Sequence, residues 1–193
     1  MRAVAMLPLV LAALCGASVP AAAQLDGPIS DSQVTAGTLS FDGHATVGDF
    51  TGTTAEVTGE LAGGSDLASV RGWVEAPVKT LETGNTKRDR DLNKSMESDK
   101  YPVIRFELTG VTPGGGGADS ATATLAGRLL IHGETREVTL PARILAVDGG
   151  IRVRTDFPLN LKDYGIGGLS KMLGMLKMSE KIEVHVDLTF GPR

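Results

Sequence analysis

The sequence is poor in cysteine and in aromatic side chains. A single cysteine, Cys15, occurs among 193 residues, and aromatic residues make up 4% of the chain. This cysteine lies in a leader-like N-terminal stretch, so its removal would leave the mature domain without disulfides or thiolate chemistry. An acylated Cys15 is the alternative, but Leu14 precedes it where such sites have a small residue. The net charge of −4 comes without a basic stripe and interleaved aromatics, which argues against a nucleic-acid partner.

Long apolar runs are also missing, except at the N-terminus. Arg2 is followed by apolar residues 3–14, a run too short to span a bilayer comfortably. Together with the small residues Ala21 to Ala23, this pattern predicts a secretory signal peptide over residues 1–23. Residues 24–193 are then expected to form one periplasmic or secreted domain without a transmembrane segment.

What the sequence does have is glycine, with 25 residues, and period-two alternation of apolar and polar side chains. Such alternation is typical of half-buried antiparallel strands, and the glycine-rich segments between the runs predict hairpin turns. About eight strands are expected, and they form a sandwich or a closed barrel because a flat sheet would expose its edges. The clearest runs are residues 103–109, 122–132, 138–144, 151–157 and 181–190, and the weaker ones are residues 39–46, 54–60 and 69–76.

One segment has helical spacing instead. Residues 168–177 place four apolar side chains on one helical face, which predicts a short amphipathic helix near the C-terminus. Gly174 opposes this helix by about 1 kcal/mol of propensity. The methionines of this segment suit an adaptable lid over a ligand, and a plain plug for the barrel is an equal alternative. The apolar face comprises Leu169, Met172, Leu173 and Leu176.

Several motifs follow one another in an order and spacing typical of a known family. They are Thr83-Gly84-Asn85, Arg88-Asp89, Leu92, Lys100-Tyr101-Pro102, Phe106, residues 127–140 (GRLLIHGETREVTL), residues 157–166 (FPLNLKDYGI) and residues 179–190 (SEKIEVHVDLTF). Over residues 36–191 the chain resembles the YceI-like family of polyisoprenoid-binding proteins. The resemblance implies a lipocalin-like antiparallel barrel, in the periplasm or outside the cell. It also implies an elongated apolar cavity that holds an isoprenoid or similar lipid.

Two segments depart from the family pattern. Residues 95–99 (SMESD) stand where the family usually has aromatic residues, so an aromatic wall of the pocket is absent there. Residues 167–177 are longer and richer in methionine than is usual for the family. Both departures leave the identity of the lipid open.

The inward apolar rows of the expected barrel form either a filled core or the wall of a lumen. Small residues in these rows, Gly72, Ala76, Gly127 and Ala142, favour an unfilled lumen. We therefore expect the larger side chains of the rows, and those of the predicted helix, to contact a ligand. They are Val74, Ile104, Phe106, Leu108, Leu125, Leu129, Ile131, Leu140, Ile144, Val153, Phe157, Leu169, Met172, Leu173, Leu176, Val184 and Val186.

Polar residues near the expected barrel ends are candidates for binding a lipid headgroup. The candidates are Asn85, Arg88 and His132, since arginine forms paired hydrogen bonds to phosphate or carboxylate groups. The alternative, which we favour, is that these residues pair with neighbours and brace their turns.

No catalytic or metal site is expected. His185 shares a strand face with Glu183 and Asp187, and His44 shares one with Asp42, both workable for metal ligands. However, alternating charges on the outer face of a strand usually indicate solvation. The sequence has neither a Gly-x-Ser-x-Gly elbow nor a phosphate-binding glycine loop. We therefore expect neither an enzyme nor a required cofactor.

Together with the resemblance, these observations predict a secreted or periplasmic protein that sequesters or carries a polyisoprenoid, a quinone or another lipid. The alternative is a protein-interaction module with a filled barrel, acting in envelope stress or redox partnership. The sequence leaves open whether two chains form a homodimer.

Overall fold

The computed structural model describes residues 25, 27–46, 48–167, 170–171 and 176–193. In this part of the chain, one α-helix, α1 (Thr86–Ser95), and three 3-10 helices (Leu67–Ser69, Val78–Thr80 and Leu161–Tyr164) connect the strands. The strands are β1 (Ser32–Ala45), β2 (Gly48–Thr54), β3 (Thr58–Ala62), β4 (Arg71–Pro77), β5 (Val103–Gly116), β6 (Ser120–Ile131), β7 (Glu134–Val147), β8 (Gly150–Asn160), β9 (Ser170–Lys171), β10 (Leu176–Lys177) and β11 (Lys181–Pro192).

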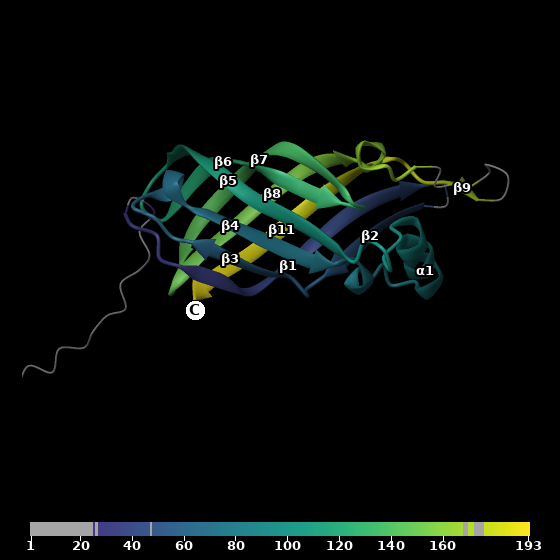
Figure 1. The fold of residues 1–193 in the computed structure, drawn as a ribbon, viewed down its shortest axis with the longest axis horizontal. Helices are drawn as coiled ribbons and strands as arrows, with labels where there is room; N and C mark the ends of the chain where they lie inside the picture. Colours follow the sequence, from purple (N-terminus) through teal and green to yellow (C-terminus); the bar gives the residue numbers. More distant parts are fainter. Residues whose placement is uncertain (1–24, 26, 47, 168–169, 172–175) are drawn as a thin grey trace, which may run out of the picture.

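Nine of these strands form one antiparallel sheet that closes on itself (Figure 1). The strand order is β11-β8-β7-β6-β5-β4-β3-β1-β2, and β1 also pairs with β11 along most of its length. β2 and β3 follow one another along the same edge of β1, so they count as one interrupted strand. The expectation of a lipocalin-like barrel with about eight antiparallel strands is confirmed. Closure pairs both edges of the sheet, and this distinguishes the barrel from the sandwich.

Two tight hairpin turns lie at glycine positions of the sequence. His132 and Gly133, between β6 and β7, both have positive φ angles, of 53° and 79°. Gly149, between β7 and β8, has a φ of 73°. Backbones of this kind match the right-handed twist of the flanking strands. The turns thereby fix the register that places Ile131 opposite Glu134.

Helix α1 lies in a segment rich in charged residues and begins at a side-chain cap. The Asn85 side chain accepts hydrogen bonds from the backbone N–H groups of Lys87 and Arg88, at 3.0 and 3.2 Å. Asp89 lies in the first turn, where a carboxylate is favoured by the helix dipole. Its Oδ1 also accepts hydrogen bonds from the backbone N–H and the hydroxyl of Thr83. An N-cap and a favourable charge therefore start the helix despite its lack of buried residues.

The helix predicted over residues 168–177 is wrong where the structure describes that segment. Ser170–Lys171 and Leu176–Lys177 form the short antiparallel pair β9 and β10. A helix of this length is marginal in water, and Gly174 lowers its stability further. Residues 168–169 and 172–175 lie outside the described residues. The one α-helix in the described part of the chain thus precedes β5 rather than β11.

The two ends of the barrel differ in what covers them (Figure 1). One end, here called the α1 end, carries α1 and the pair β9 and β10. The opposite end, here called the C-terminal end, is crossed by the segment before β1, because Ile29 and Gly64 exchange two backbone hydrogen bonds of 2.9 Å. Leu67 and Val70 are buried beside this crossing, and Asp66 caps their 3-10 helix. Apolar side chains therefore close the C-terminal end.

Candidate functional site

Alternation along the strands turns one row of side chains into the barrel. On β8, Ile151 and Phe157 are buried, whereas Arg154 and Asp156 between them are exposed. Neighbouring strands keep the same rows in register, so that Val184 of β11 lies opposite Phe157. The interior is thus lined by the apolar half of each strand.

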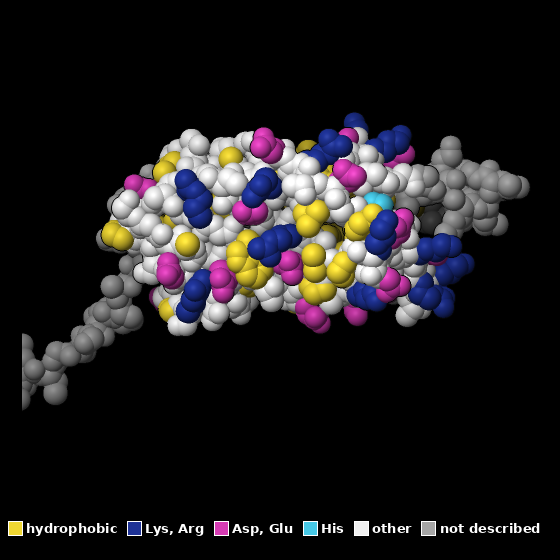
Figure 2. Space-filling view, in the orientation of Figure 1, with side chains coloured by type: hydrophobic (Ala, Val, Ile, Leu, Met, Phe, Trp, Pro, Cys, Tyr) yellow, Lys and Arg dark blue, Asp and Glu magenta, His cyan; other side chains and the backbone are white. Residues whose placement is uncertain are grey.

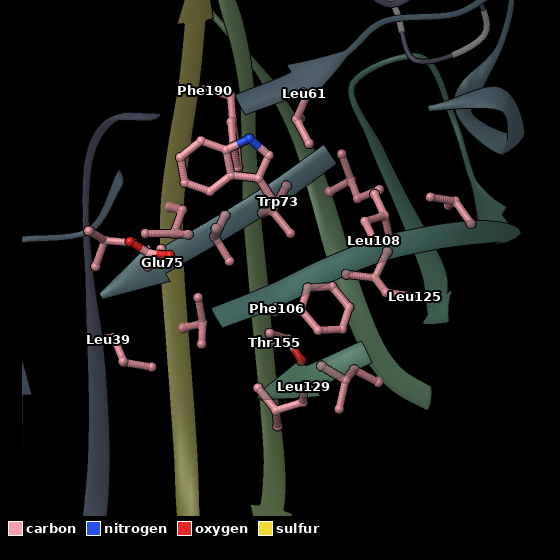
Figure 3. Close-up of a pocket in the computed structure, with 18 of the residues that line it drawn as sticks. Leu39, Leu61, Trp73, Glu75, Phe106, Leu108, Leu125, Leu129, Thr155 and Phe190 are labelled. Carbon is pink, nitrogen blue, oxygen red and sulfur yellow. The ribbon is translucent and has the colours of Figure 1, made fainter. Parts of the chain in front are cut away.

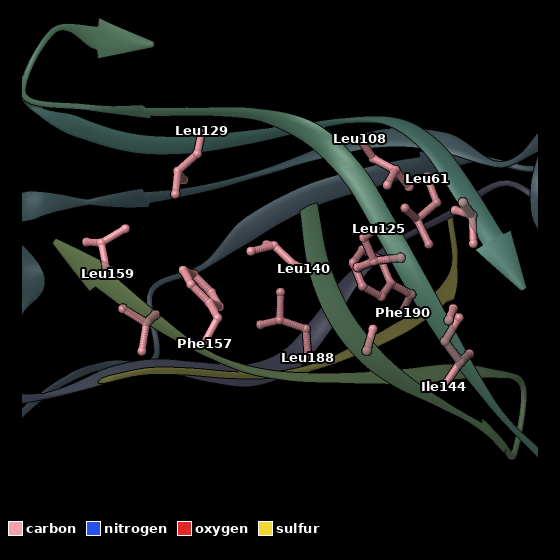
Figure 4. Packing of buried hydrophobic residues seen from close by; sticks show 14 of the residues in the cluster. Leu61, Leu108, Leu125, Leu129, Leu140, Ile144, Phe157, Leu159, Leu188 and Phe190 are labelled. Carbon is pink, nitrogen blue, oxygen red and sulfur yellow. The ribbon is translucent and has the colours of Figure 1, made fainter. Parts of the chain in front are cut away.

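These inward rows form one hydrophobic cluster that leaves some space within the barrel. They enclose an apolar cavity of about 140 Å³, whose wall includes side chains from every strand position around the barrel (Figures 3 and 4). The interior of the barrel is therefore not completely filled. The predicted ligand contacts that line this lumen are Val74, Ile104, Phe106, Leu108, Leu125, Leu129, Leu140, Ile144, Val153, Phe157, Val184 and Val186. Their contact with a ligand stays a prediction.

Other predicted ligand contacts lie elsewhere or outside the described residues. Ile131 is buried in the core but does not line the lumen, because it lies nearer the α1 end than Leu129 does. Leu176 is part of β10, of which only the backbone is described. Leu169, Met172 and Leu173 lie outside the described residues, and the lid proposed from them stays a prediction.

The structure also adds lining residues that the sequence analysis did not select. Ile151 and Leu188 extend the alternating rows of β8 and β11, so continuing the period would have identified them. Leu67 and Val70 come from the 3-10 helix region between β3 and β4, where no periodicity indicates the direction of a side chain. Further lining residues include Leu39, Val57, Leu61, Val111, Thr155 and Phe190.

The glycines of the inward rows do not create the empty space. A Cβ atom at Gly127 would lie 2.4 Å from the ring of Phe106, so this ring already occupies the position. A Cβ atom at Gly72 would lie 2.7 Å from a methyl group of Leu61. The inference that these glycines mark unfilled volume was therefore wrong, although the lumen exists. Each glycine accommodates a large neighbour, as glycine paired with an aromatic residue commonly does in barrels.

Polar groups are few along the lumen. Glu75 and Trp73 are among the lining residues, but on β4 they alternate with the inward Val74 and belong to the outer face. Outside the barrel, Arg105 donates a 3.1 Å hydrogen bond to Glu75, and its guanidinium lies 4.3 Å from the centroid of the Trp73 ring. Thr155 is the remaining polar lining residue, and its side chain belongs to the inward row of β8 (Figure 3).

The three headgroup candidates are held by contacts within the protein. Asn85 caps α1, and the guanidinium of Arg88 lies 4.3 Å from the centroid of the Phe50 ring. Nδ1 of His132 lies 3.1 Å from the backbone oxygen of Tyr164, and its ring contacts that of Tyr101 at 4.6 Å between centroids. These contacts support the alternative that the residues brace the α1 end of the barrel.

The outer face carries charged side chains of both signs, which lie among uncharged and hydrophobic ones (Figure 2). Figure 2 shows basic and acidic groups interspersed over the strands, with several basic side chains over α1. Asp187 accepts two hydrogen bonds from Arg152, at 2.6 and 2.7 Å, and one from Arg154. These hydrogen bonds, those from Arg152 first, hold the pKa of Asp187 below its usual range. The contacts cross from β8 to β11 and stabilise that pairing.

His185 links three strands on this outer face. Its Nδ1 lies 2.6 Å from Asp156 of β8, and its Nε2 lies 3.2 Å from Asp42 of β1. The hydrogen bond to Asp156, followed by that to Asp42, raises the pKa of His185 despite partial burial. The two ring nitrogens point to opposite sides, so these three groups do not converge on one point. Among the described residues, no cluster of His, Cys, Asp or Glu is arranged to hold a metal ion.

The described helices include none with the length and apolar character needed to cross a bilayer.

A UPF0312 protein of Pseudomonas fluorescens is 27% identical over 124 residues, which cover 58% of this chain and 60% of that protein. The chain thus matches less than two thirds of this relative's length.

Two solved structures have a similar fold. One is BcnA of Burkholderia cenocepacia, with a TM-score of 0.67 and 14% identity over 80% of this chain and 95% of that one. The other is a polyisoprenoid-binding domain from Saccharophagus degradans, implicated in plant cell wall breakdown. Its TM-score is 0.68, with 15% identity over 86% of this chain and 99% of that one. At such low identity these likenesses show the fold. The model of the YceI-like domain matches residues 30–190, most of the chain, and the protein therefore belongs to the YceI-like family.

Proposed function

We propose that this protein binds a long apolar molecule, such as a polyisoprenoid or the tail of a quinone, inside the barrel. The observation that carries the proposal is the lumen, a cavity of about 140 Å³ with an almost entirely hydrocarbon wall. The similar domain from Saccharophagus degradans, described as polyisoprenoid-binding, supports the same ligand class. Binding of this kind needs no catalytic residue, so we propose a carrier or sequestering protein and not an enzyme.

The energetics favour a thin, flexible ligand. An apolar cavity of roughly 150 Å³ lined by Leu, Ile and Phe stays dry and accepts a benzene-sized molecule. A cavity of this size thus holds about one isoprene unit, and we propose that a longer chain widens the lumen or extends beyond it. Each buried methylene contributes about 0.8 kcal/mol, so a prenyl chain can offset the entropy lost when it is ordered.

We propose that the protein acts in the periplasm or outside the cell, after removal of residues 1–23. The predicted signal peptide supports this location. A protein-interaction module with a filled barrel is less well supported, because the barrel interior contains an apolar void. A homodimer stays a prediction.

The test is to express the full chain and to purify the mature product without detergent. Native mass spectrometry then reports bound lipid and the number of chains together, and extraction followed by mass spectrometry identifies the lipid. We expect a prenyl lipid or quinone in a 1:1 complex. A protein that is isolated empty and also rejects added prenyl lipids and quinones would contradict the proposal.

A further inference from the structure

We infer that Thr155 forms a polar subsite inside the lumen, where its hydroxyl binds an uncharged oxygen of the ligand. The inference deepens the proposed function and rests on it. It names the ligand class as an apolar chain that carries an alcohol, a ketone or a quinone carbonyl. It also places that oxygen within the barrel rather than at the α1 end.

The first observation is that the Thr155 hydroxyl is buried without a partner. Thr155 is 7% exposed, and its Oγ1 has no hydrogen-bond partner in the protein. It lies between Val153 and Phe157 in a row that lines the lumen (Figure 3). A buried hydroxyl without a hydrogen bond destabilises a fold, and valine has the same shape without this penalty. A threonine at this position is thus explained if a ligand supplies the missing partner.

The second observation is the place of Thr155 in the sheet. The last pair between β7 and β8 joins Arg143 to Arg154, so the pairing of these two strands ends immediately before Thr155. On its other side Thr155 pairs with Val186 of β11, which also lines the lumen. The hydroxyl therefore lies beside a part of the wall where β8 is paired with β11 but no longer with β7.

The third observation concerns charge. Among the described residues that line the lumen, none is Lys, Arg or His, and the Glu75 carboxylate is on the outer face with Arg105. A phosphate or carboxylate inside the barrel would be buried without a counter-charge, which is strongly unfavourable. A neutral oxygen needs one hydrogen bond, and a hydroxyl can donate or accept it. The subsite therefore selects an alcohol or a carbonyl over a phosphorylated chain.

The α1 end offers less to a polar group. Asn85 already accepts two hydrogen bonds as a helix cap, and Arg88 stacks on Phe50. His132 contacts Tyr164 and Tyr101. Asn85 and Arg88 thus have partners among the described residues. Nε2 of His132 is buried without a hydrogen bond, as Thr155 Oγ1 is, but His132 does not line the lumen, whereas Thr155 does.

The experiment compares two branched C20 probes that differ in one hydroxyl, phytanol and phytane. Both are loaded from cyclodextrin, and native mass spectrometry measures the fraction bound at equilibrium. Wild type is compared with Thr155→Val, which keeps the shape, and Thr155→Ser, which keeps the hydroxyl. Thr124→Val is the matched control, because Thr124 is exposed on β6.

We expect Thr155→Val to weaken phytanol binding about tenfold and to leave phytane binding unchanged. Thr155→Ser and Thr124→Val should keep the wild-type preference for phytanol. The empty Thr155→Val protein should also melt at a higher temperature than wild type, which verifies that it folds.

Two results would overturn the inference in distinguishable ways. If wild type binds neither probe, the proposed function fails and the subsite fails with it. If wild type binds both probes, and Thr155→Val changes their binding equally or not at all, the lumen binds lipid but Thr155 is not the polar subsite.

Discussion

The aromatic ring of Phe106 on β5 occupies the place where Gly127 on β6 has no side chain. A Cβ atom at Gly127 would lie 2.4 Å from this ring and 2.4 Å from the backbone oxygen of Glu107. Real Cβ atoms do not approach other heavy atoms so closely, so the ring or the strand would have to move. Phe106 also lines the lumen, and the pair thus connects the packing of the wall to the shape of the cavity.

Gly127→Ala is expected to lower the free energy of unfolding by about 1–3 kcal/mol, the usual cost of overpacking. The displaced Phe106 ring would also narrow the lumen and reduce lipid uptake. Urea denaturation measures the first effect, and native mass spectrometry the second. Gly115→Ala serves as the control, because a Cβ atom there meets nothing within 4 Å. Equal stability of the two variants would contradict the prediction.

Leu129→Trp is expected to block lipid uptake, because a larger side chain would fill part of the lumen. Leu130→Trp is the matched control, since Leu130 alternates with the buried Leu129 on β6 and faces outward. Both proteins are loaded with a prenyl lipid and weighed by native mass spectrometry. If the two variants retain as much lipid as wild type, the lumen is not the binding site.

Asn85→Ala is expected to destabilise the protein by about 1 kcal/mol, because the first turn of α1 loses its cap. Asn85→Asp should retain most of the stability, since a carboxylate also caps a helix. Urea denaturation measures both variants. Neither change should alter lipid affinity, and a loss of affinity at unchanged stability would instead identify Asn85 as a headgroup contact.

His185 should make stability depend on pH above neutrality. Its pKa is raised in the folded protein, first by Asp156 and then by Asp42. The charged form is therefore favoured by folding, and its stabilisation is complete below the unfolded pKa of about 6.5. This stabilisation is lost as the pH rises through the higher folded pKa. The melting temperature of wild type minus that of His185→Gln should thus fall as the pH rises above about 6.5.

The carboxyl of Asp42 contributes with the opposite sign. Hydrogen bonds from Thr51 and then from His185 lower its pKa, so its stabilisation is lost as the pH falls through the lowered value. This loss lies in the acid range, well separated from that of His185. A difference in melting temperature that does not change with pH above neutrality would contradict the role given to His185.

The strands were predictable wherever one face is buried and the other solvated. Residues 151–157 and 181–190 alternate apolar and polar groups. They form parts of β8 and β11, and their apolar side chains face the interior as predicted. Closure into a barrel was not predictable from that pattern alone. It depends on the pairing of β1 with β11, two segments at opposite ends of the domain. The family resemblance supplied this information.

Other parts of the site were missed for local reasons. Helix α1 has no buried residue, so hydrophobic periodicity gave no signal for it. Thr155 was passed over because it is polar, although it continues the row of Val153 and Phe157. The glycine at position 127 was taken for a gap, because sequence alone does not show which neighbouring ring will cover it.

The junction of β1 with β11 has a consequence for the order of assembly. It joins Ser32 to Pro192 and Asp42 to Glu183, so β1 cannot complete its pairing until β11 is available. Ordering contacts so distant along the chain is slow, and an unpaired strand edge in the meantime can pair with other chains. During synthesis, which releases the chain from its N-terminus, the sheet will therefore keep an unpaired edge until β11 is available.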